Sequence, residues 1–293
     1  MKNFEHYRSV WADDELRRHL ARIRHVALDM DGTIYMGSTL FPFTRPFLAR
    51  LREQGIEHSF LTNNPTKSID DYLHRLDTMG IPTSREEMYT STLATIDYLR
   101  KNLPAARRLF LLGTPSMVAE FRAAGFSEAG ETADDRPDAV IVSFDMTLRY
   151  ERLCRAAWWV SRGLPYLATN PDRICPTDLP TVLVDCGSIC AAIAHATGRH
   201  PDVTLGKPDP NMLSGIRMRH GLQADEIAMV GDRIYTDVET AHNAGALGVL
   251  VLSGETTLEV AEQAPRRPHL IVDDIGTLGE LLAASRSGDR FRQ

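Results

Sequence analysis

Two acidic residues, Asp29 and Asp31, lie one residue apart at the end of the apolar run "HVAL" and are followed directly by Gly32. Side chains at positions i and i+2 point to the same side of an extended strand, so we expect both carboxylates to face one crevice. Like charges held this close repel each other unless a divalent cation neutralises them or one carboxyl keeps a proton. The pair therefore predicts a magnesium site combined with an acid–base group.

Polar side chains also follow two other apolar runs. Thr62 ends the run "SFLT", and Asp232 ends "IAMVGD". Open parallel sheets bind their ligands outside the carboxyl ends of the strands. We therefore expect Asp29, Thr62 and Asp232 to lie at such strand ends.

Apolar runs of strand length alternate with stretches of helical spacing along the chain, which is typical of an α/β protein with a largely parallel sheet. The pattern is interrupted by the polar, proline-containing segment "IPTSREEMY" and resumes near "GKPDP". Another set of strands and helices lies between these two segments. This order predicts an inserted domain at residues 83–203, within a core made of residues 1–82 and 204–293.

Composition favours a small ligand over a polymer. The net charge of −6 and the isoelectric point near 5.9 provide no basic field for nucleic acid or an anionic membrane. No run approaches the roughly 18 apolar residues of a membrane span, and the N-terminal stretch lacks the apolar segment of a signal peptide, so we expect a cytoplasmic protein. The histidines His25 and His195 do not show the spacing of metal ligands.

The segments "DMDGT", "LTNN", "GKPDP" and "GDRIYTD" follow one another in this order, with a domain-sized gap between the second and the third. Together they resemble the motifs of the haloacid dehalogenase superfamily, and within it the NagD-like phosphatases, which act on nitrophenyl phosphate, phosphoglycolate, pyridoxal phosphate and sugar phosphates. The resemblance implies a Rossmann-like core with a parallel sheet, and it identifies the insertion as the larger, α/β C2-type cap.

The resemblance also implies roles for individual residues. Asp29 is expected to be the nucleophile that forms an aspartyl-phosphate, and Asp31 the general acid and base. Lys207 is expected to provide a compact positive charge beside the phosphate. For Mg²⁺, the implied ligands are Asp29, the backbone carbonyl of Asp31 and Asp232, while Asp237 holds a metal-bound water or orients Lys207.

Further residues are expected to bind the substrate. Gly32 and Thr33 would turn backbone amides toward the phosphate, since glycine allows the main chain to approach a ligand closely. Thr62 and Asn63 would donate hydrogen bonds to phosphoryl oxygens. In the cap, the stretch from Arg173 to Ser188 resembles the substrate-facing loop of the family and the helix that follows it. The residues expected to contact the substrate there are Arg173, Asp185, Gly187 and Ser188.

Each motif alone has an ordinary structural explanation. Asp-Gly after a strand is more often a turn than a catalytic site, and "GDRIYTD" fits a helix cap. Their joint order favours catalysis, and we predict a magnesium-dependent phosphomonoesterase that forms a homodimer and acts on a small phosphorylated metabolite, with a slight preference for a sugar or polyol phosphate. The alternatives are a phosphotransferase or phosphomutase that uses the same aspartate, and a non-catalytic protein that binds a phosphate ligand.

Overall fold

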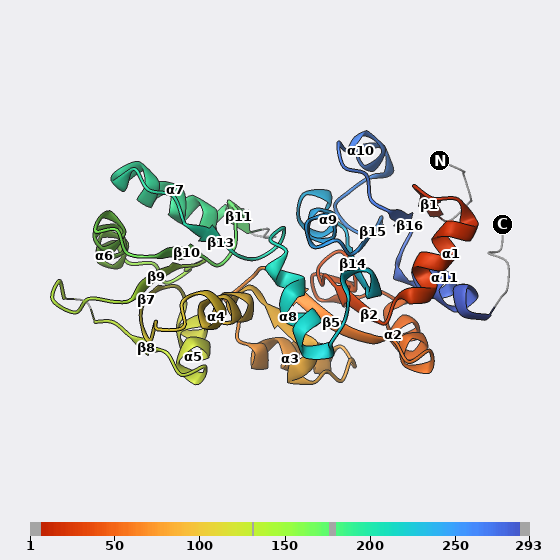
Figure 1. The fold of residues 1–293 in the computed structure, drawn as a ribbon, viewed down its shortest axis with the longest axis horizontal. Helices are drawn as coiled ribbons and strands as arrows, with labels where there is room; N and C mark the ends of the chain where they lie inside the picture. The colour runs from red at the N-terminus through yellow and green to blue at the C-terminus, as the bar shows by residue number, and fades with distance from the viewer. Residues whose placement is uncertain (1–6, 131, 176–179, 288–293) are drawn as a thin grey trace. The chain divides into compact units, whose positions relative to one another are not determined.

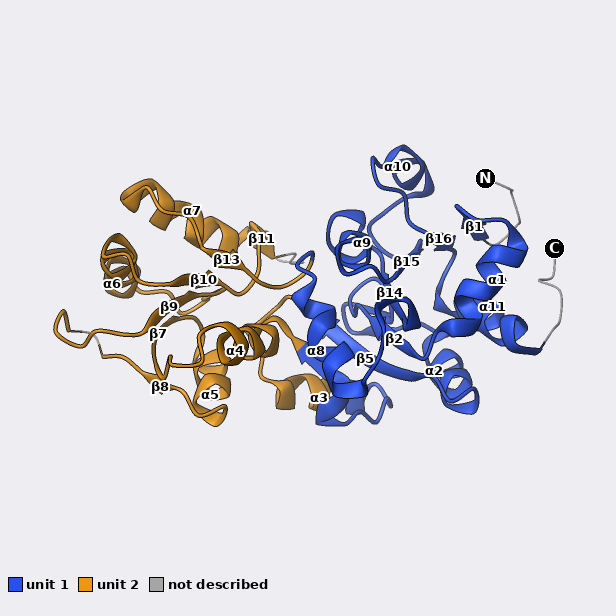
Figure 2. Cartoon of the chain, in the orientation of Figure 1, with its two compact units in different colours: residues 1–61, 76–89, 208–293 blue, residues 62–75, 90–207 orange. Residues whose placement is uncertain are grey.

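The structure is a computed structural model that describes residues 7–130, 132–175 and 180–287. The chain divides into two compact units (Figure 2). The first contains residues 1–61, 76–89 and 208–293, and the second contains residues 62–75 and 90–207. Compared with the boundaries expected from sequence, residues 62–75 and 204–207 fall in the second unit, and residues 83–89 fall in the first.

A seven-stranded sheet forms the centre of the first unit, with the order β1-β16-β15-β14-β2-β5-β6. Strand β2 pairs in parallel with β14 and β5, β15 pairs in parallel with β14 and β16, and only the edge strand β1 is antiparallel to its neighbour among the pairings described. Its strands are β1 (Tyr7–Ser9), β2 (His25–Leu28), β5 (Glu57–Thr62), β6 (Met88–Thr90), β14 (Ile227–Gly231), β15 (Leu247–Val251) and β16 (Leu270–Val272).

Helices flank this sheet, and α11 packs against both α1 and α2 (Figure 1). Helix α1 carries acidic residues in its first turn and His19 and Arg22 in its last, as the helix macrodipole favours. The remaining elements of this unit are the short hairpin β3 (Tyr35–Met36) and β4 (Thr39–Leu40), and the helices α1 (Asp13–Arg22), α2 (Thr44–Glu53), α8 (Asn211–His220), α9 (Glu239–Ala244), α10 (Leu258–Gln263) and α11 (Ile275–Ser287). Helix α3 (Ile69–Thr78) begins in the second unit and ends in the first.

The second unit contains a five-stranded sheet with the order β13-β10-β9-β7-β8, in which every pair is parallel. Its middle strands β9 and β10 are fully buried, which explains their continuous apolar runs. The strands are β7 (Arg108–Leu112), β8 (Ser127–Glu128), β9 (Ala139–Val142), β10 (Tyr166–Ala168) and β13 (Val203–Thr204), and a separate antiparallel hairpin is formed by β11 (Ile174–Cys175) and β12 (Leu183–Val184).

In the described part of the second unit, four helices lie entirely within it, and two of them, α6 and α7, pack against each other and share one apolar core. Cys186 and Cys190 on α7 belong to this core, and their sulfur atoms lie 3.9 Å apart without a disulfide. The helices are α4 (Ser91–Asn102), α5 (Pro115–Ala123), α6 (Tyr150–Ser161) and α7 (Cys186–Thr197).

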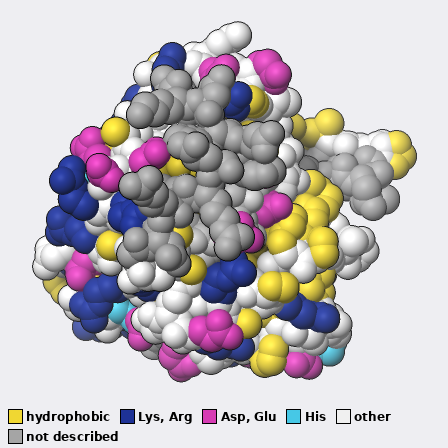
Figure 3. Space-filling view, turned by 90° about the vertical axis from the view of Figure 1, so that its right-hand side faces the viewer, with side chains coloured by type: hydrophobic (Ala, Val, Ile, Leu, Met, Phe, Trp, Pro, Cys, Tyr) yellow, Lys and Arg dark blue, Asp and Glu magenta, His cyan; other side chains and the backbone are white. Residues whose placement is uncertain are grey.

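The predicted α/β class with parallel sheets is confirmed, and each apolar run named above as a strand forms one. Strand β6 was not expected, because it is only three residues long and follows a polar segment with a short 3₁₀ turn, Arg85–Glu87. Among the described residues, no helix is long and apolar enough to cross a membrane. On the face drawn in Figure 3, acidic and basic side chains of the described residues are interspersed, in keeping with the small net charge.

Candidate active site

Three carboxylates gather at the carboxyl edge of the first unit's sheet. Asp29 follows β2, Asp232 follows the neighbouring strand β14, and Asp237 lies in a π-helical turn, Ile234–Val238. One carboxylate oxygen of each lies within 4.8 Å of the others. Asp232 and Asp237 are buried and Asp29 is half-buried, so water screens their repulsion poorly.

Glycines make room for these acids. Gly32 has a φ of +85°, and a Cβ atom built on it would overlap the Asp232 carboxylate. A Cβ on Gly254 would overlap the same carboxylate, and one on Gly231 would overlap Asp237. The "DG" and "SG" sequences at the strand ends are therefore required by the space that the carboxylates occupy.

Backbone donors fix the positions of the two buried acids. The Glu255 N–H donates to Asp232 Oδ2 at 2.7 Å, and the Arg233 N–H donates to Asp237 Oδ2 at 3.1 Å. The Ser253 hydroxyl donates to the Gly32 carbonyl at 2.7 Å and so connects the loop after β15 to the turn after β2. These bonds pre-organise the carboxylates on rigid elements.

Arg233 is the cationic group beside the cluster. Burial lowers its pKa, but the charges of Asp29 and Asp232 outweigh burial and raise the pKa above its usual value. Its Nε atom lies 2.9 Å from Glu255 Oε2. No sequence motif points to Arg233, whereas Ser253 and Glu255 follow the end of β15 and could be expected from the position of ligand sites at strand ends.

The donor set fits a hard divalent cation. Carboxylate oxygens are the ligands that Mg²⁺ prefers, and three of them in a partly buried group need a compensating charge. Asp31 is not part of this described group, and its side chain is exposed. Strand β2 ends at Leu28, so the extended backbone on which the shared-crevice expectation depended does not reach Asp31.

The turn after β2 has its own hydrogen bonds. The Gly32 N–H donates to the Tyr35 carbonyl at 2.8 Å, and the Thr33 N–H donates to the Met30 carbonyl at 3.2 Å. Thr33 is fully buried. The backbone amides of Gly32 and Thr33, which were predicted to bind the phosphate, therefore already have hydrogen-bond partners within this tight turn.

In the second unit, the side chain of Asn63 holds the backbone of Lys207. Asn63 Oδ1 accepts from the Lys207 N–H at 2.6 Å, and Asn63 Nδ2 donates to the Lys207 carbonyl at 2.9 Å. The other amide hydrogen is directed to Asp172 Oδ2 at 3.0 Å. Asn63 is thus a positioning residue for Lys207, which is itself buried. Thr62, which ends β5, accepts a hydrogen bond from the Asn64 N–H at 3.1 Å.

A buried polar network continues from Asn63 along the carboxyl ends of the second unit's strands. Asn170 Nδ2 donates to Asp172 Oδ2 at 3.1 Å and to Asp185 Oδ1 at 2.9 Å. The Thr169 hydroxyl lies 2.9 Å from Ser143 Oγ. Sequence reasoning missed Asn170 and Asp172, although "TNPD" after β10 is similar to "TNNP" after β5.

The residues expected to contact the substrate in the cap have different environments. Asp185 is buried and caps helix α7 by accepting from the Cys186 N–H. The Gly187 N–H donates to the Asp172 carbonyl at 2.8 Å, and the Ser188 hydroxyl donates to the Arg173 carbonyl at 2.7 Å. Only the Arg173 side chain is exposed among the four. Within this stretch, residues 176–179 lie outside the described part of the chain.

The structure therefore brings the predicted residues together in two groups, one in each unit. The group of the first unit contains Asp29, Asp232 and Asp237. The group of the second unit contains Asn63 and Lys207, with Asp185 joined to them through Asn170 and Asp172.

Known proteins are similar to this chain in sequence and in architecture. A family model of haloacid dehalogenase-like hydrolases matches residues 26–127, and a HAD-hydrolase-like model matches residues 204–278. Ribonucleotide monophosphatase NagD of Escherichia coli is 30% identical over 87% of this chain and 98% of its own length. The acid sugar phosphatase of Staphylococcus aureus is 33% identical over 79% of this chain and 87% of its own length. The crystal structure of a 4-nitrophenylphosphatase from Thermotoga maritima matches with a TM-score of 0.84 and 39% sequence identity. The match covers 89% of this chain and 98% of that one.

Asp185 predicts a pH-dependent difference in stability. Burial raises the pKa of its carboxyl from 3.8 to about 6, so the folded protein binds this proton more tightly than the unfolded chain. The resulting stabilisation is present below pH 4 and is lost as the pH rises through 6, by at most about 3 kcal/mol. Asp185→Asn cannot ionise, so its free energy of unfolding relative to the wild type should increase between pH 4 and pH 7. Urea unfolding at several pH values measures this, and a constant difference would contradict it.

Replacing Gly254 by a residue with a side chain should weaken cation binding for a steric reason. In Gly254→Ala, the new Cβ must displace the Asp232 carboxylate, and we expect Mg²⁺ to bind at least about tenfold more weakly by calorimetry. Gly248→Ala on β15 is the matched control, because its Cβ would meet Ala241 rather than a carboxylate. Equal Mg²⁺ affinity in the wild type and Gly254→Ala would show that Asp232 is not a ligand.

Proposed function

Because the chain belongs to the haloacid dehalogenase-like hydrolases, we propose that it is a magnesium-dependent phosphomonoesterase acting on a small phosphorylated metabolite, with a sugar or polyol phosphate preferred. The class of reaction follows from its phosphatase relatives. The observation that carries the proposal is the gathering of Asp29, Asp232 and Asp237 at the carboxyl edge of one parallel sheet. One of these acids is available as a nucleophile, and the group matches the ligands of a hard cation.

The proposed reaction has two steps. In the first, an Asp29 carboxylate oxygen bonds to phosphorus while the P–O bond to the leaving group breaks, and Asp31 protonates the departing oxygen. In the second, Asp31 takes a proton from water, the water oxygen bonds to phosphorus, and the bond between Asp29 and phosphorus breaks. Asp29 is restored and inorganic phosphate leaves.

When bound, Mg²⁺ would neutralise the carboxylates and polarise the phosphoryl oxygens. Asp29, the Asp31 carbonyl and Asp232 are the proposed ligands, and Asp237 supports the site. Phosphoryl binding is assigned to Lys207 through its positive charge. The family motifs assign neutral hydrogen bonds to the phosphoryl group to Gly32, Thr33, Thr62 and Asn63. In this structure the Gly32 and Thr33 amides and the Asn63 amide hydrogens already have partners within the chain, so Thr62 is the remaining candidate donor of this set.

The second unit is proposed to select the substrate. None of the four motifs of the chemical step includes residues 83–203, so these residues are free to vary with the leaving group. Arg173 is the best candidate for a contact with the non-phosphate part of the substrate, because its charged side chain is exposed. Asp185 and Ser188 support this segment through the hydrogen bonds of their backbone N–H and hydroxyl groups to the Arg173 carbonyl.

Asp29→Asn tests the nucleophile. An amide cannot attack phosphorus and is a poorer cation ligand, so phosphate release from a panel of phosphorylated metabolites should fall by at least about a thousandfold, or about 4 kcal/mol of activation free energy. The wild type should lose its activity in chelator and recover it with Mg²⁺.

Circular dichroism and thermal unfolding provide the control that Asp29→Asn is folded. Residual activity within tenfold of the wild type would overturn the assignment of Asp29. Substrate binding without turnover by the wild type would instead indicate a non-catalytic phosphate-binding protein, and transfer to an acceptor other than water would indicate a phosphotransferase.

Arg173→Ala tests substrate selection. We expect kcat/KM for the preferred metabolite to fall about tenfold or more, while kcat/KM for an aryl phosphate changes little, since only the metabolite uses this contact in its transition state. Arg136→Ala is the matched control, because Arg136 is another exposed arginine of the second unit. Equal losses for both substrates would argue for a role of Arg173 in folding or in the chemical step.

A further inference from the structure

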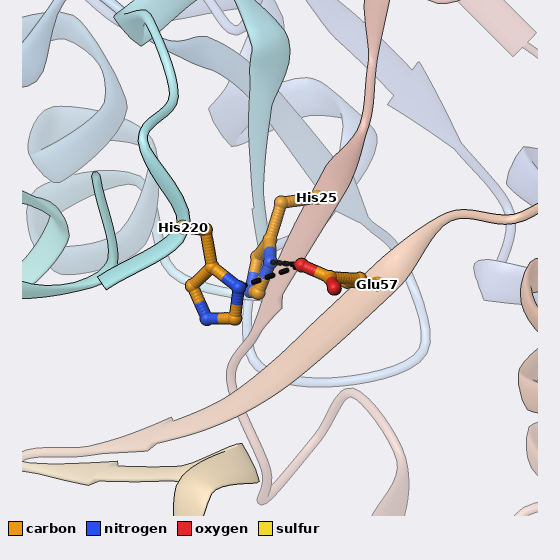
Figure 4. A group of neighbouring side chains, drawn as sticks. All are labelled: His25, Glu57 and His220. Atoms are coloured by element: carbon orange, nitrogen blue, oxygen red, sulfur yellow. Dashed lines mark ion pairs between the residues drawn. The ribbon is translucent and has the colours of Figure 1, made fainter. Parts of the chain in front are cut away.

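A second group of ligand-type side chains lies at the opposite end of β2 from the acidic cluster. His25 is the first residue of β2, Glu57 is the first residue of β5, and the two are direct partners in the register of these parallel strands. His220 is the last residue of α8. One ligand atom of each lies within 4.8 Å of the others, and the three side chains point toward one another (Figure 4).

Glu57 joins the two histidines through one oxygen. His220 Nδ1 lies 2.6 Å from Glu57 Oε2, and His25 Nδ1 lies 3.7 Å from the same atom. The first distance is that of a close polar contact, whereas the second is too long for a hydrogen bond. A contact such as that between the exposed Glu57 and the half-buried His220 is ordinary near a protein surface and contributes little to stability.

The contact between Glu57 and His220 does not account for the buried position of His25. Its side chain is completely buried, and its Nε2 atom lies 3.0 Å from Ser59 Oγ. Its Nδ1 atom has no hydrogen-bond partner among the described residues and faces the Glu57 carboxylate. A buried polar atom normally has a partner, because leaving it without one costs about 1–3 kcal/mol.

We propose that His25, Glu57 and His220 bind a divalent cation of the zinc class at the amino ends of β2 and β5. Around a tetrahedral zinc ion with ligand distances near 2.0 Å, two ligand atoms are about 3.3 Å apart, and the distances of 2.6 and 3.7 Å lie on either side of that value. The bound cation supplies the partner that His25 Nδ1 lacks.

The chemistry of the donors selects this class of ion. Two imidazoles and one carboxylate suit zinc and its neighbours among the transition metals, whereas Mg²⁺ prefers oxygen ligands alone. The imidazole of His25 coordinates in its neutral form, through the ring nitrogen that faces Glu57. The Ser59 hydroxyl orients the ring from the other side.

The surroundings also suit a cation. His220 ends α8, and the negative end of a helix dipole stabilises positive charge. The Glu57 side chain is 62% exposed and the His220 side chain 26% exposed, so an ion can enter from solvent and complete its coordination with water. The site would connect the neighbouring strands β2 and β5 to α8, and binding should therefore raise the unfolding temperature.

The test uses zinc chloride as the probe with the full-length protein. Metal analysis after dialysis should find one zinc per chain in excess Mg²⁺, and Co²⁺ in its place should give the visible absorption of low-coordinate cobalt. His220→Ala and Glu57→Gln should bind zinc at least about tenfold more weakly by calorimetry and lose the shift in unfolding temperature. Two ligand variants are used because His25 is buried and its replacement is the most disruptive.

Two control variants separate this site from other sources of zinc binding. His195→Ala removes an exposed histidine of α7 and should bind zinc as the wild type does. Asp232→Asn alters the acidic cluster and should also retain the zinc. The proposal is overturned if His220→Ala and Glu57→Gln bind zinc normally, if His195→Ala loses it equally, or if Asp232→Asn abolishes it. Circular dichroism verifies that each variant is folded.

Discussion

Repulsion among Asp29, Asp232 and Asp237 is the constraint on which the rest of the first unit depends. Three carboxylates with atoms within 4.8 Å of one another, two of them buried, are costly in a folded chain unless positive charge compensates them. The strands hold the acids at one sheet edge. At the neighbouring glycines, any residue with a Cβ atom would overlap the Asp232 or Asp237 carboxylate. Arg233 supplies one nearby positive charge, and a hard cation is the natural second.

In the second unit, hydrogen bonds position the backbone of a buried lysine, Lys207. Asn63 and Lys207 are 144 residues apart in the chain, yet the amide of one spans the backbone N–H and carbonyl of the other. Asp172 and Asn170 extend this network to the cap of α7. Because nearly every polar group named here has a partner, the network favours one conformation of the segments that carry Asn63 and Lys207.

Much of this arrangement could be predicted from the sequence, because the signals are local. Asp29 and Asp232 follow apolar runs, and parallel strands bring such ends to one edge. Asp31 was harder, since its direction depends on where the strand stops, and β2 stops at Leu28. The capping role of Asp185 follows from its position before a helix and could have been recognised.

Long-range contacts could not be predicted in this way. His25, Glu57 and His220 are far apart in the sequence, and no spacing rule connects a strand start to a helix end. The hydrogen bonds between Asn63 and Lys207 could not be predicted from the sequence either, because the motif predicts that Asn63 donates to phosphate rather than to another segment of the chain. Such contacts arise from tertiary packing alone.

In the proposed reaction, a carboxylate of the first unit carries the phosphoryl group during turnover. Acid quenching of the enzyme within one turnover, followed by borohydride reduction and peptide mapping by mass spectrometry, locates that group directly. We expect modification of Asp29 and of no other acid. Modification of Asp31 or Asp232, or hydrolysis at full rate with no modified acid at any quench time, would contradict it.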